Sequence, residues 1–149
     1  MKILETCLYV DDLDQATEFY TSILGFNLYS REDDRHVFLA GDQAMLLLFN
    51  PDVTAHEIDG MVPSHGGFGP GHVCFEIELG EEEKYEQLLI DNGIEVEKKV
   101  YFGPHLSIYF RDPAGNSLEF AARRLWGKAL DQWTSVQLVS RSVCQQEVK

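Results

Sequence analysis

An internal repeat constrains the fold of this chain more than any other feature of its sequence. Residues 3–50 and 71–122 each show the order strand, helix, strand, strand, strand. In both copies a glycine closes the helix, Gly25 in the first and Gly93 in the second, one residue out of step. Self-similarity of this kind indicates two copies of one supersecondary unit that pack on each other. The sequence therefore predicts an α+β fold made of two βαβββ modules.

Hydrophobic periodicity assigns the individual elements of each copy. The first helix is expected to begin after Asp12, a residue type favoured as an N-cap, and to end at Gly25. The second helix is expected over residues 81–93. Strands are predicted at 3–10, 26–30, 36–41 and 44–50 in the first copy, and at 72–79, 94–100, 106–112 and 117–122 in the second.

The chain is long enough for one domain with a hydrophobic core of its own, because it has 149 residues. We expect this domain over residues 1–127, with module one at 3–50 and module two at 71–122. Residues 51–70 are rich in Gly and Pro and show no periodicity, so they are expected to form a linker. Residues 128–149 are expected to form a C-terminal tail.

Charge and composition exclude several classes of partner. The chain has 25 acidic and 12 basic residues, a net charge of −13 that disfavours nucleic acid and anionic membranes. No stretch approaches the 18 apolar residues of a membrane span, and the N-terminus lacks the small-residue cleavage site of a signal peptide. Three cysteines without tight spacing do not suggest a disulfide framework. We therefore expect a cytoplasmic protein with a small-molecule substrate.

The repeat also makes particular residues equivalent. It aligns Glu5 with His72 and sets Leu47 opposite Glu119. If the modules pack about a pseudo-twofold axis, these positions face one another, and burying the carboxylates there is costly unless a cation satisfies them. Glu5, His72 and Glu119 are therefore predicted to bind one divalent metal ion. Taken singly, each has a plainer interpretation, since a Glu in a strand usually faces solvent and a lone His is usually a turn or core residue. Most same-face neighbours are small, as a cavity requires: Cys7, Cys74, Ser117 and Ala121.

Three segments carry a resemblance to a known superfamily: "LETCLYVDDLDQATEFYTSILGF", "GPGHVCFEI" and "SIYFRDPAGNSLEF". They resemble the vicinal oxygen chelate proteins, which include glyoxalase I, fosfomycin-resistance thiol transferases, extradiol dioxygenases and bleomycin-resistance proteins. The resemblance covers about residues 3–122. It implies that the modules form curled, half-barrel mixed sheets around a metal site, with Glu5, His72 and Glu119 at ligand positions.

The resemblance leaves the reaction open. Bacterial glyoxalase I has a further carboxylate ligand where this chain has Leu47, so glyoxalase I activity is in doubt. Three protein ligands on an octahedral ion leave up to about three positions for water and substrate. We expect one divalent ion, Mn, Fe, Zn or Ni, and an enzyme acting on an oxygen-chelating small molecule as a lyase, thiol transferase or dioxygenase. The alternative is a metal-free small-molecule binder of the antibiotic-sequestering, bleomycin-resistance type.

Further residues are candidates for catalysis. Besides Glu119, we expect Tyr109 to act as a proton donor. His65 lies in a glycine-rich loop that leads to His72 and could close over the site, although a plain surface histidine is the simpler interpretation of its position. Cys7 and Cys74 are expected simply to pack.

Candidate substrate-binding residues are Ser107, Arg111 and Arg35. Ser107 and Arg111 alternate with Tyr109 on one face of a predicted strand, and either arginine could clamp an anion. The structural alternative is that Arg111 packs on the following turn. That turn contains Asp112, which we interpret as structural. Proteins that resemble this one commonly dimerise, so a homodimer is expected, and the modules could pair within a chain or between chains.

Overall fold

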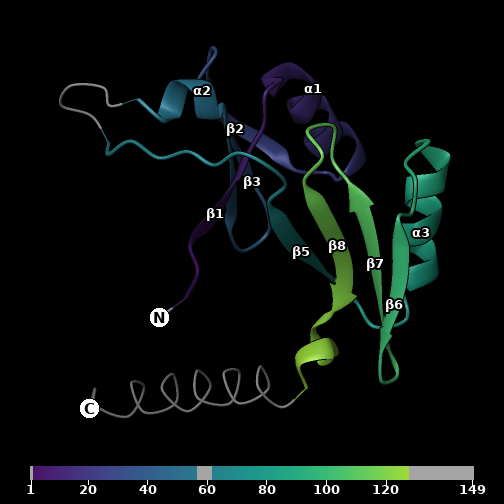
Figure 1. Cartoon of the computed structure of the whole chain (residues 1–149). Helices are drawn as coiled ribbons and strands as arrows, with labels where there is room; N and C mark the ends of the chain where they lie inside the picture. The colour runs from purple at the N-terminus through teal and green to yellow at the C-terminus, as the bar shows by residue number, and fades with distance from the viewer. Residues whose placement is uncertain (1, 57–61, 128–149) are drawn as a thin grey trace, which may run out of the picture.

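In the computed structural model, which describes residues 2–56 and 62–127, two four-stranded sheets form the body of the protein (Figure 1). Module one consists of β1 (Glu5–Tyr9), α1 (Leu13–Glu18), a π-helical continuation η1 (Phe19–Ile23), β2 (Asn27–Glu32), β3 (His36–Ala40) and β4 (Met45–Phe49). Module two consists of β5 (His72–Ile77), α3 (Glu82–Asp91), β6 (Lys98–Phe102), β7 (His105–Arg111) and β8 (Ser117–Ala122). A short helix α2 (Pro51–Thr54) follows module one, and a 3-10 helix η2 (Arg123–Trp126) follows module two.

The two sheets have the same topology, which confirms the α+β fold of two βαβββ-like modules. Their strand orders are β1-β4-β3-β2 and β5-β8-β7-β6. In each sheet the first strand runs parallel to the last, and the other pairs are antiparallel, so both sheets are mixed. Cys7 pairs with Leu47, and Cys74 pairs with Glu119. Strand register therefore makes Leu47 the equivalent of Glu119, as the repeat predicts. The curling of the sheets into half-barrels remains a prediction.

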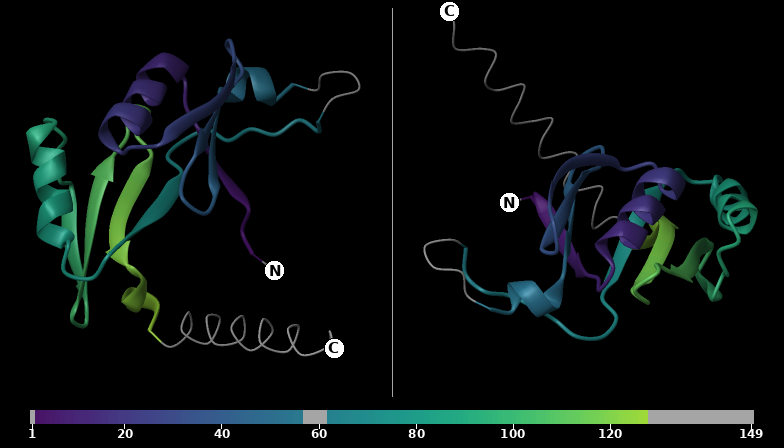
Figure 2. Two further views of the ribbon diagram at one scale, coloured as in Figure 1. Left: turned by 180° about the vertical axis from the view of Figure 1, so that it is seen from behind. Right: turned by 90° about the horizontal axis from the view of Figure 1, so that it is seen from above.

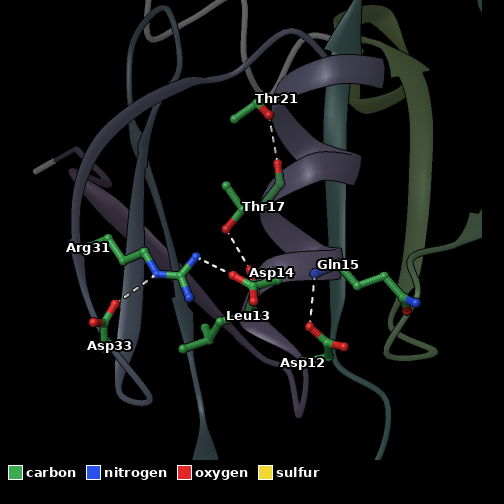
Figure 3. Close-up of polar contacts among 8 residues, drawn as sticks. All are labelled: Asp12, Leu13, Asp14, Gln15, Thr17, Thr21, Arg31 and Asp33. Carbon is green, nitrogen blue, oxygen red and sulfur yellow. Dashed lines mark hydrogen bonds and ion pairs between the residues drawn. The ribbon is translucent and has the colours of Figure 1, made fainter.

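The first helix begins as predicted but ends differently. The Asp12 side chain accepts a hydrogen bond from the Gln15 backbone N–H at 2.9 Å, so Asp12 is the N-cap (Figure 3). The Thr17 and Thr21 hydroxyls donate to backbone carbonyls four residues earlier, at 2.6 and 2.8 Å. Such hydroxyls compete with the regular helical ladder. From Phe19 onward the helix widens to the π form, which the amphipathic pattern alone did not predict.

Two other elements differ from the predicted ones. The strand expected at 94–100 is observed at Lys98–Phe102, because Ile94 and Val96 pack against the core instead of extending the ladder. The linker contains α2, which the sequence analysis did not predict. Asn50 caps this helix by accepting from the Asp52 N–H at 3.0 Å, and Pro51 occupies its first turn.

One hydrophobic cluster joins the two modules. Leu8 and Leu48 from module one and Leu118 and Phe120 from module two belong to it, all 3% exposed or less. The Tyr85 ring of α3 packs 4.9 Å from the Phe120 ring, so α3 packs against the core side of the second sheet, beside which it runs in Figure 2. Because side chains alternate along a strand, Glu119 points to the opposite face. The core thus leaves the second face of each sheet available for a site.

A buried polar network also connects the modules. The Tyr20 hydroxyl donates to Asp112 Oδ2 at 2.8 Å. The Asn116 amide donates to Asp112 Oδ2 at 2.9 Å and to the Tyr9 carbonyl at 3.0 Å, while its oxygen accepts from the Gly71 N–H at 2.7 Å. Burial, with the Asp112 charge as a second cause, raises the pKa of Tyr20 far above its usual value. These contacts confirm the structural interpretation of Asp112.

Replacing Tyr20 with Phe is expected to lower the free energy of unfolding by about 1.5–3 kcal/mol, the usual loss for a hydrogen bond to a charged group. The Tyr20 side chain is fully buried, and its loss leaves Asp112 without this donor. Urea denaturation followed by circular dichroism measures the change. Tyr29→Phe is a control, since Tyr29 is 74% exposed. Equal midpoints for Tyr20→Phe and wild type would show that the network adds nothing to stability.

No helix in the described ranges is long and apolar enough to cross a membrane. The tail assigned to 128–149 lies outside the described residues, and the domain boundaries given above remain predictions.

Candidate functional site

Glu119 is the centre of the candidate site. It lies on β8, a central strand, between Cys74 of β5 and Tyr109 of β7, both of which are its register partners. Glu119 is only 5% exposed although it points away from the core face of its sheet. A buried carboxylate in the middle of a sheet requires a compensating group, because desolvation disfavours its charge.

The imidazole of His72 lies next to the Glu119 carboxylate. Its Nε2 lies 3.3 Å from Glu119 Oε2, and its Nδ1 lies 3.0 Å from the Ser117 carbonyl oxygen. A carbonyl only accepts, so Nδ1 carries a hydrogen and donates it. In neutral His72, Nε2 then presents a lone pair to the carboxylate. Two acceptors at this distance need a proton or a metal cation between them. Metal-binding histidines commonly have this arrangement, with the second ring nitrogen donating to a backbone carbonyl.

Two buried oxygens at the site have no hydrogen-bond partner among the described residues. They are Glu119 Oε1 and Ser107 Oγ, and Ser107 is fully buried. Buried polar atoms are nearly always satisfied in native proteins, so these two mark a place for an ion, water or ligand. The donor set of one imidazole and one carboxylate fits a divalent metal ion.

Glu5 does not join this pair within one chain. It is exposed on β1, and the described part of the chain contains no group of three or more His, Cys, Asp or Glu side chains placed to hold a metal ion. Folding of one chain alone therefore does not gather Glu5, His72 and Glu119 within the described residues, and their joint role as metal ligands remains a prediction. The physical reason is the shared core. The apolar faces of both sheets contribute to one cluster, so the opposite faces, which carry Glu5 and Glu119, are not packed together.

Tyr109 and Cys74 flank the carboxylate. Burial, followed by the Glu119 charge, raises the pKa of Tyr109, and the Tyr109 ring lies 6.3 Å from the His72 ring. The same two causes in the same order raise the pKa of Cys74 to about 12. Cys7 and Cys74 are both exposed, so the expectation that they simply pack is wrong. Strand alternation predicted that Cys74 lies on the same sheet face as His72. That pattern could have identified Cys74 as a residue of the site.

His65, in the linker, packs against module one. Its Nδ1 is 3.1 Å from the Tyr9 hydroxyl, its ring packs edge-on to Phe49 at 4.5 Å, and its backbone N–H donates to the Thr54 carbonyl. These contacts attach His65 to the sheet that carries Glu5 and not to the His72–Glu119 pair. Its expected catalytic role therefore requires module one to face module two of another copy.

The two candidate arginines have different environments. Arg111 donates to both carboxylate oxygens of Glu97, at 2.6 and 2.9 Å, and to the Gly115 carbonyl at 3.0 Å. Its guanidinium is thus engaged by the turn, in agreement with the structural alternative. Arg35 is buried at the start of β3, and its Nη1 has no hydrogen-bond partner among the described residues.

Comparison with known proteins gives the family. A model of the Glyoxalase/Bleomycin resistance protein/Dioxygenase superfamily matches residues 2–120, so the chain belongs to this superfamily. It is similar to a lactoylglutathione lyase from Agrobacterium tumefaciens, with 36% identity, a TM-score of 0.81, and coverage of 85% of this chain and 96% of the other.

Two further structures share the fold at lower identity. One is a glyoxalase/bleomycin resistance protein/dioxygenase from Nocardioides, with 29% identity, a TM-score of 0.66, and coverage of 82% of this chain and 83% of the other. The second is an integron cassette protein from the mobile metagenome of the Halifax Harbour sewage outfall, with 28% identity, a TM-score of 0.66, and coverage of 81% and 97%. The superfamily assignment made from sequence motifs is confirmed.

Proposed function

We propose that this protein is a divalent-metal-dependent enzyme that acts on an oxygen-chelating small molecule. The observation that carries the proposal is the buried Glu119 carboxylate, which faces Nε2 of His72 and has one oxygen without a partner among the described residues. A carboxylate of purely structural value would be expected to find donors in the protein, because an unsatisfied buried charge is destabilising.

His72, Glu119 and the Glu5 of a second copy would hold the ion. Two carboxylates and one imidazole favour Mn²⁺ or Fe²⁺, while Zn²⁺ and Ni²⁺ also fit such ligands. When bound, the ion supplies Lewis-acid stabilisation of negative charge on a substrate oxygen. Tyr109 keeps its proton at neutral pH, since burial and Glu119 raise its pKa, and it can donate that proton at its hydroxyl. The Ser107 hydroxyl lacks a partner among the described residues, so it is free to bind a substrate oxygen.

A homodimer would complete the site. Ile3 is 80% exposed and Leu4 is 74% exposed, and both immediately precede Glu5. Large apolar side chains exposed together favour burial against another surface. If the start of β1 packs on a second copy, Glu5 is buried with it. The same packing would bring His65 of one copy toward His72 and Glu119 of the other, because His65 contacts Tyr9 on β1, the strand that carries Glu5.

Mixing two inactive variants tests this arrangement. Glu5→Ala and Glu119→Ala are each expected to lose metal binding, but a mixed dimer regains one intact site from Glu5 of one copy and His72–Glu119 of the other. Equal amounts, unfolded and refolded together, should bind about one quarter as much Mn²⁺ as wild type, because about half of the dimers are mixed and each has one site. Equilibrium dialysis with metal analysis gives the stoichiometry.

Refolding each variant alone is the control and should give no bound metal. If the mixture also binds none while wild type binds one ion per chain, the site is not shared between copies. Sedimentation of wild type as a monomer at micromolar concentration would lead to the same conclusion.

A metal-free binding protein is the second candidate. It is favoured by the ability of His72 to balance Glu119 as a protonated imidazolium at 3.3 Å, without any metal. Metal analysis of protein purified without chelator, before and after reconstitution, separates the two functions. Stoichiometric metal supports the enzyme, and none after reconstitution supports the binder.

The reaction is proposed to be a lyase, thiol-transfer or dioxygenase step. The resemblance to a lactoylglutathione lyase favours a glutathione conjugate as substrate. Leu47 argues against the isomerisation that glyoxalase I catalyses. Strand register makes this buried, apolar residue the equivalent of Glu119. A metal ion at the proposed site would lack the carboxylate ligand that bacterial glyoxalase I has where this chain has Leu47.

A further inference from the structure

Arg35 is a buried charge without a counter-charge in the described part of the chain. It is 6% exposed, and its guanidinium forms no hydrogen bond or ion pair with any residue in the described ranges. Arginines are almost never buried unless they are paired, because moving the charge out of water is costly.

Other arginines of the chain show the usual behaviour. Arg31, Arg111 and Arg123 each pair with a carboxylate, although their side chains are 31–44% exposed. Two of the three acidic residues that precede Arg35 in sequence have other partners, and the third, Asp34, is exposed. Glu32 lies 3.5 Å from His36, and Asp33 lies 3.5 Å from Arg31. The most buried of these four arginines is therefore the one that lacks an anion.

The backbone fixes Arg35 in this position. Its N–H donates to the Glu32 carbonyl at 3.2 Å, and its carbonyl accepts from the Asn50 N–H at 2.9 Å. The preceding residue, Asp34, has a positive φ of 62°, so the chain turns sharply before Arg35. Asn50 is the N-cap of α2. The backbone of Arg35 is therefore held between the β2–β3 turn and the start of α2.

The surroundings add no second positive charge. The neighbouring His36 ring stacks on Phe38 at 4.1 Å, and burial lowers the pKa of His36, with Arg35 adding a smaller effect in the same direction and Glu32 opposing both. The charge at this place is thus that of a planar guanidinium, which binds carboxylate and phosphate groups with two parallel hydrogen bonds.

We propose that Arg35 binds an anionic group, a carboxylate or a phosphate, of a small molecule. If the proposed enzymatic function holds, its substrate is then an anionic oxygen chelator, and that extension rests on the proposed function. Binding of the anion itself rests on Arg35 alone. A net charge of −13 repels anions from the protein as a whole, so a response to small anions requires a local site of this kind.

Thermal unfolding of metal-free protein tests the proposal. The probes are inorganic phosphate and acetate, each compared with sodium chloride at equal ionic strength. A ligand that binds only the folded state raises the melting temperature by mass action, so wild type should show a saturable rise of roughly 3 °C or more with at least one probe. A response to phosphate alone or acetate alone identifies the class of anion.

Three variants give the test its specificity. Arg35→Met should abolish the rise and should melt no lower than wild type without anions, because it removes an uncompensated charge and keeps much of the volume. Arg35→Lys keeps the charge without the planar fork, so its apparent Kd should increase about tenfold or more. Arg111→Met should respond like wild type, because Arg111 is already engaged by Glu97.

Either of two results would overturn the proposal. One is a wild-type protein that responds to neither anion beyond the chloride control. The other is a response that persists unchanged in Arg35→Met or, if that variant does not fold, in Arg35→Lys. Because the protein carries no metal in these measurements, failure of the metal-dependent function leaves their outcome unaffected.

Discussion

Replacement of Glu119 with Ala is expected to lower the affinity for Mn²⁺ or Zn²⁺ by at least two orders of magnitude and to leave the fold intact. Loss of one of three protein ligands, and of a full negative charge, removes about 3 kcal/mol or more of binding free energy, which corresponds to this ratio. The fold should persist, because Glu119 points away from the core and one of its oxygens is unpartnered among the described residues. Glu119→Gln keeps the shape and removes only the charge, so it should lose most of the same affinity.

Competition with a chelating dye measures the dissociation constants, and circular dichroism checks the fold. Glu76→Gln is a matched control, because Glu76 lies on the same strand face as His72 but pairs with Arg123. It should bind metal as wild type does. Tight binding by both Glu119 variants would show that the metal site lies elsewhere.

The fold was predictable because local residue patterns indicate each element and because the internal repeat shows the order of elements twice. Alternation of apolar and polar residues predicted the strands, and Asp12 predicted the start of the first helix. The repeated order of elements predicted that both sheets share one topology. What could not be predicted depends on tertiary packing or on competing hydrogen bonds. Ile94 and Val96 read as a strand, but they bury their side chains against the core before β6 begins. Thr17 and Thr21, whose hydroxyls donate to backbone carbonyls, lie just before and within the π-helical turn that begins at Phe19. They leave the spacing of the apolar residues unchanged, so that spacing did not predict the turn.

The candidate site was predictable only in part. Equivalence of repeat positions correctly brought His72 and Glu119 onto neighbouring strands, because a parallel pair of first and last strands is built into the module. The same equivalence does not bring Glu5 beside them within the described part of one chain, so its role as a ligand remains a prediction. The pseudo-symmetry of the repeat makes Glu5 and His72 equivalent, but it does not determine which module faces which. The shared core separates the sheet face that carries Glu5 from the one that carries Glu119. Arg35 showed no pattern in sequence beyond its charge, and only its burial separates it from the other arginines.

The hemithioacetal of glutathione and methylglyoxal is expected to be a poor substrate. A general base must lie within hydrogen-bond reach of the proton that it removes. In bacterial glyoxalase I a carboxylate is present at the position of Leu47, whereas here that position is apolar and 8% exposed. Glu5 and Glu119 are the other candidate bases, and both would be committed to the metal ion. One of them could dissociate and act as the base, so the measurement is decisive.

Steady-state assays of protein loaded with Ni²⁺, Zn²⁺ or Mn²⁺ should give background rates with this substrate. A value of kcat/KM near the ~10⁴–10⁸ M⁻¹s⁻¹ of cognate enzymes would contradict the prediction. Leu47→Glu provides the converse test, since it restores a carboxylate opposite Cys7, at the position equivalent to Glu119. A rise in the isomerase rate of about 10²-fold or more, the usual contribution of a positioned base, would show that residue 47 separates this chain from glyoxalase I. Metal affinity measured on the same variant should also rise, because a fourth ligand is added, and an increase in affinity without any increase in rate would assign residue 47 to metal binding alone.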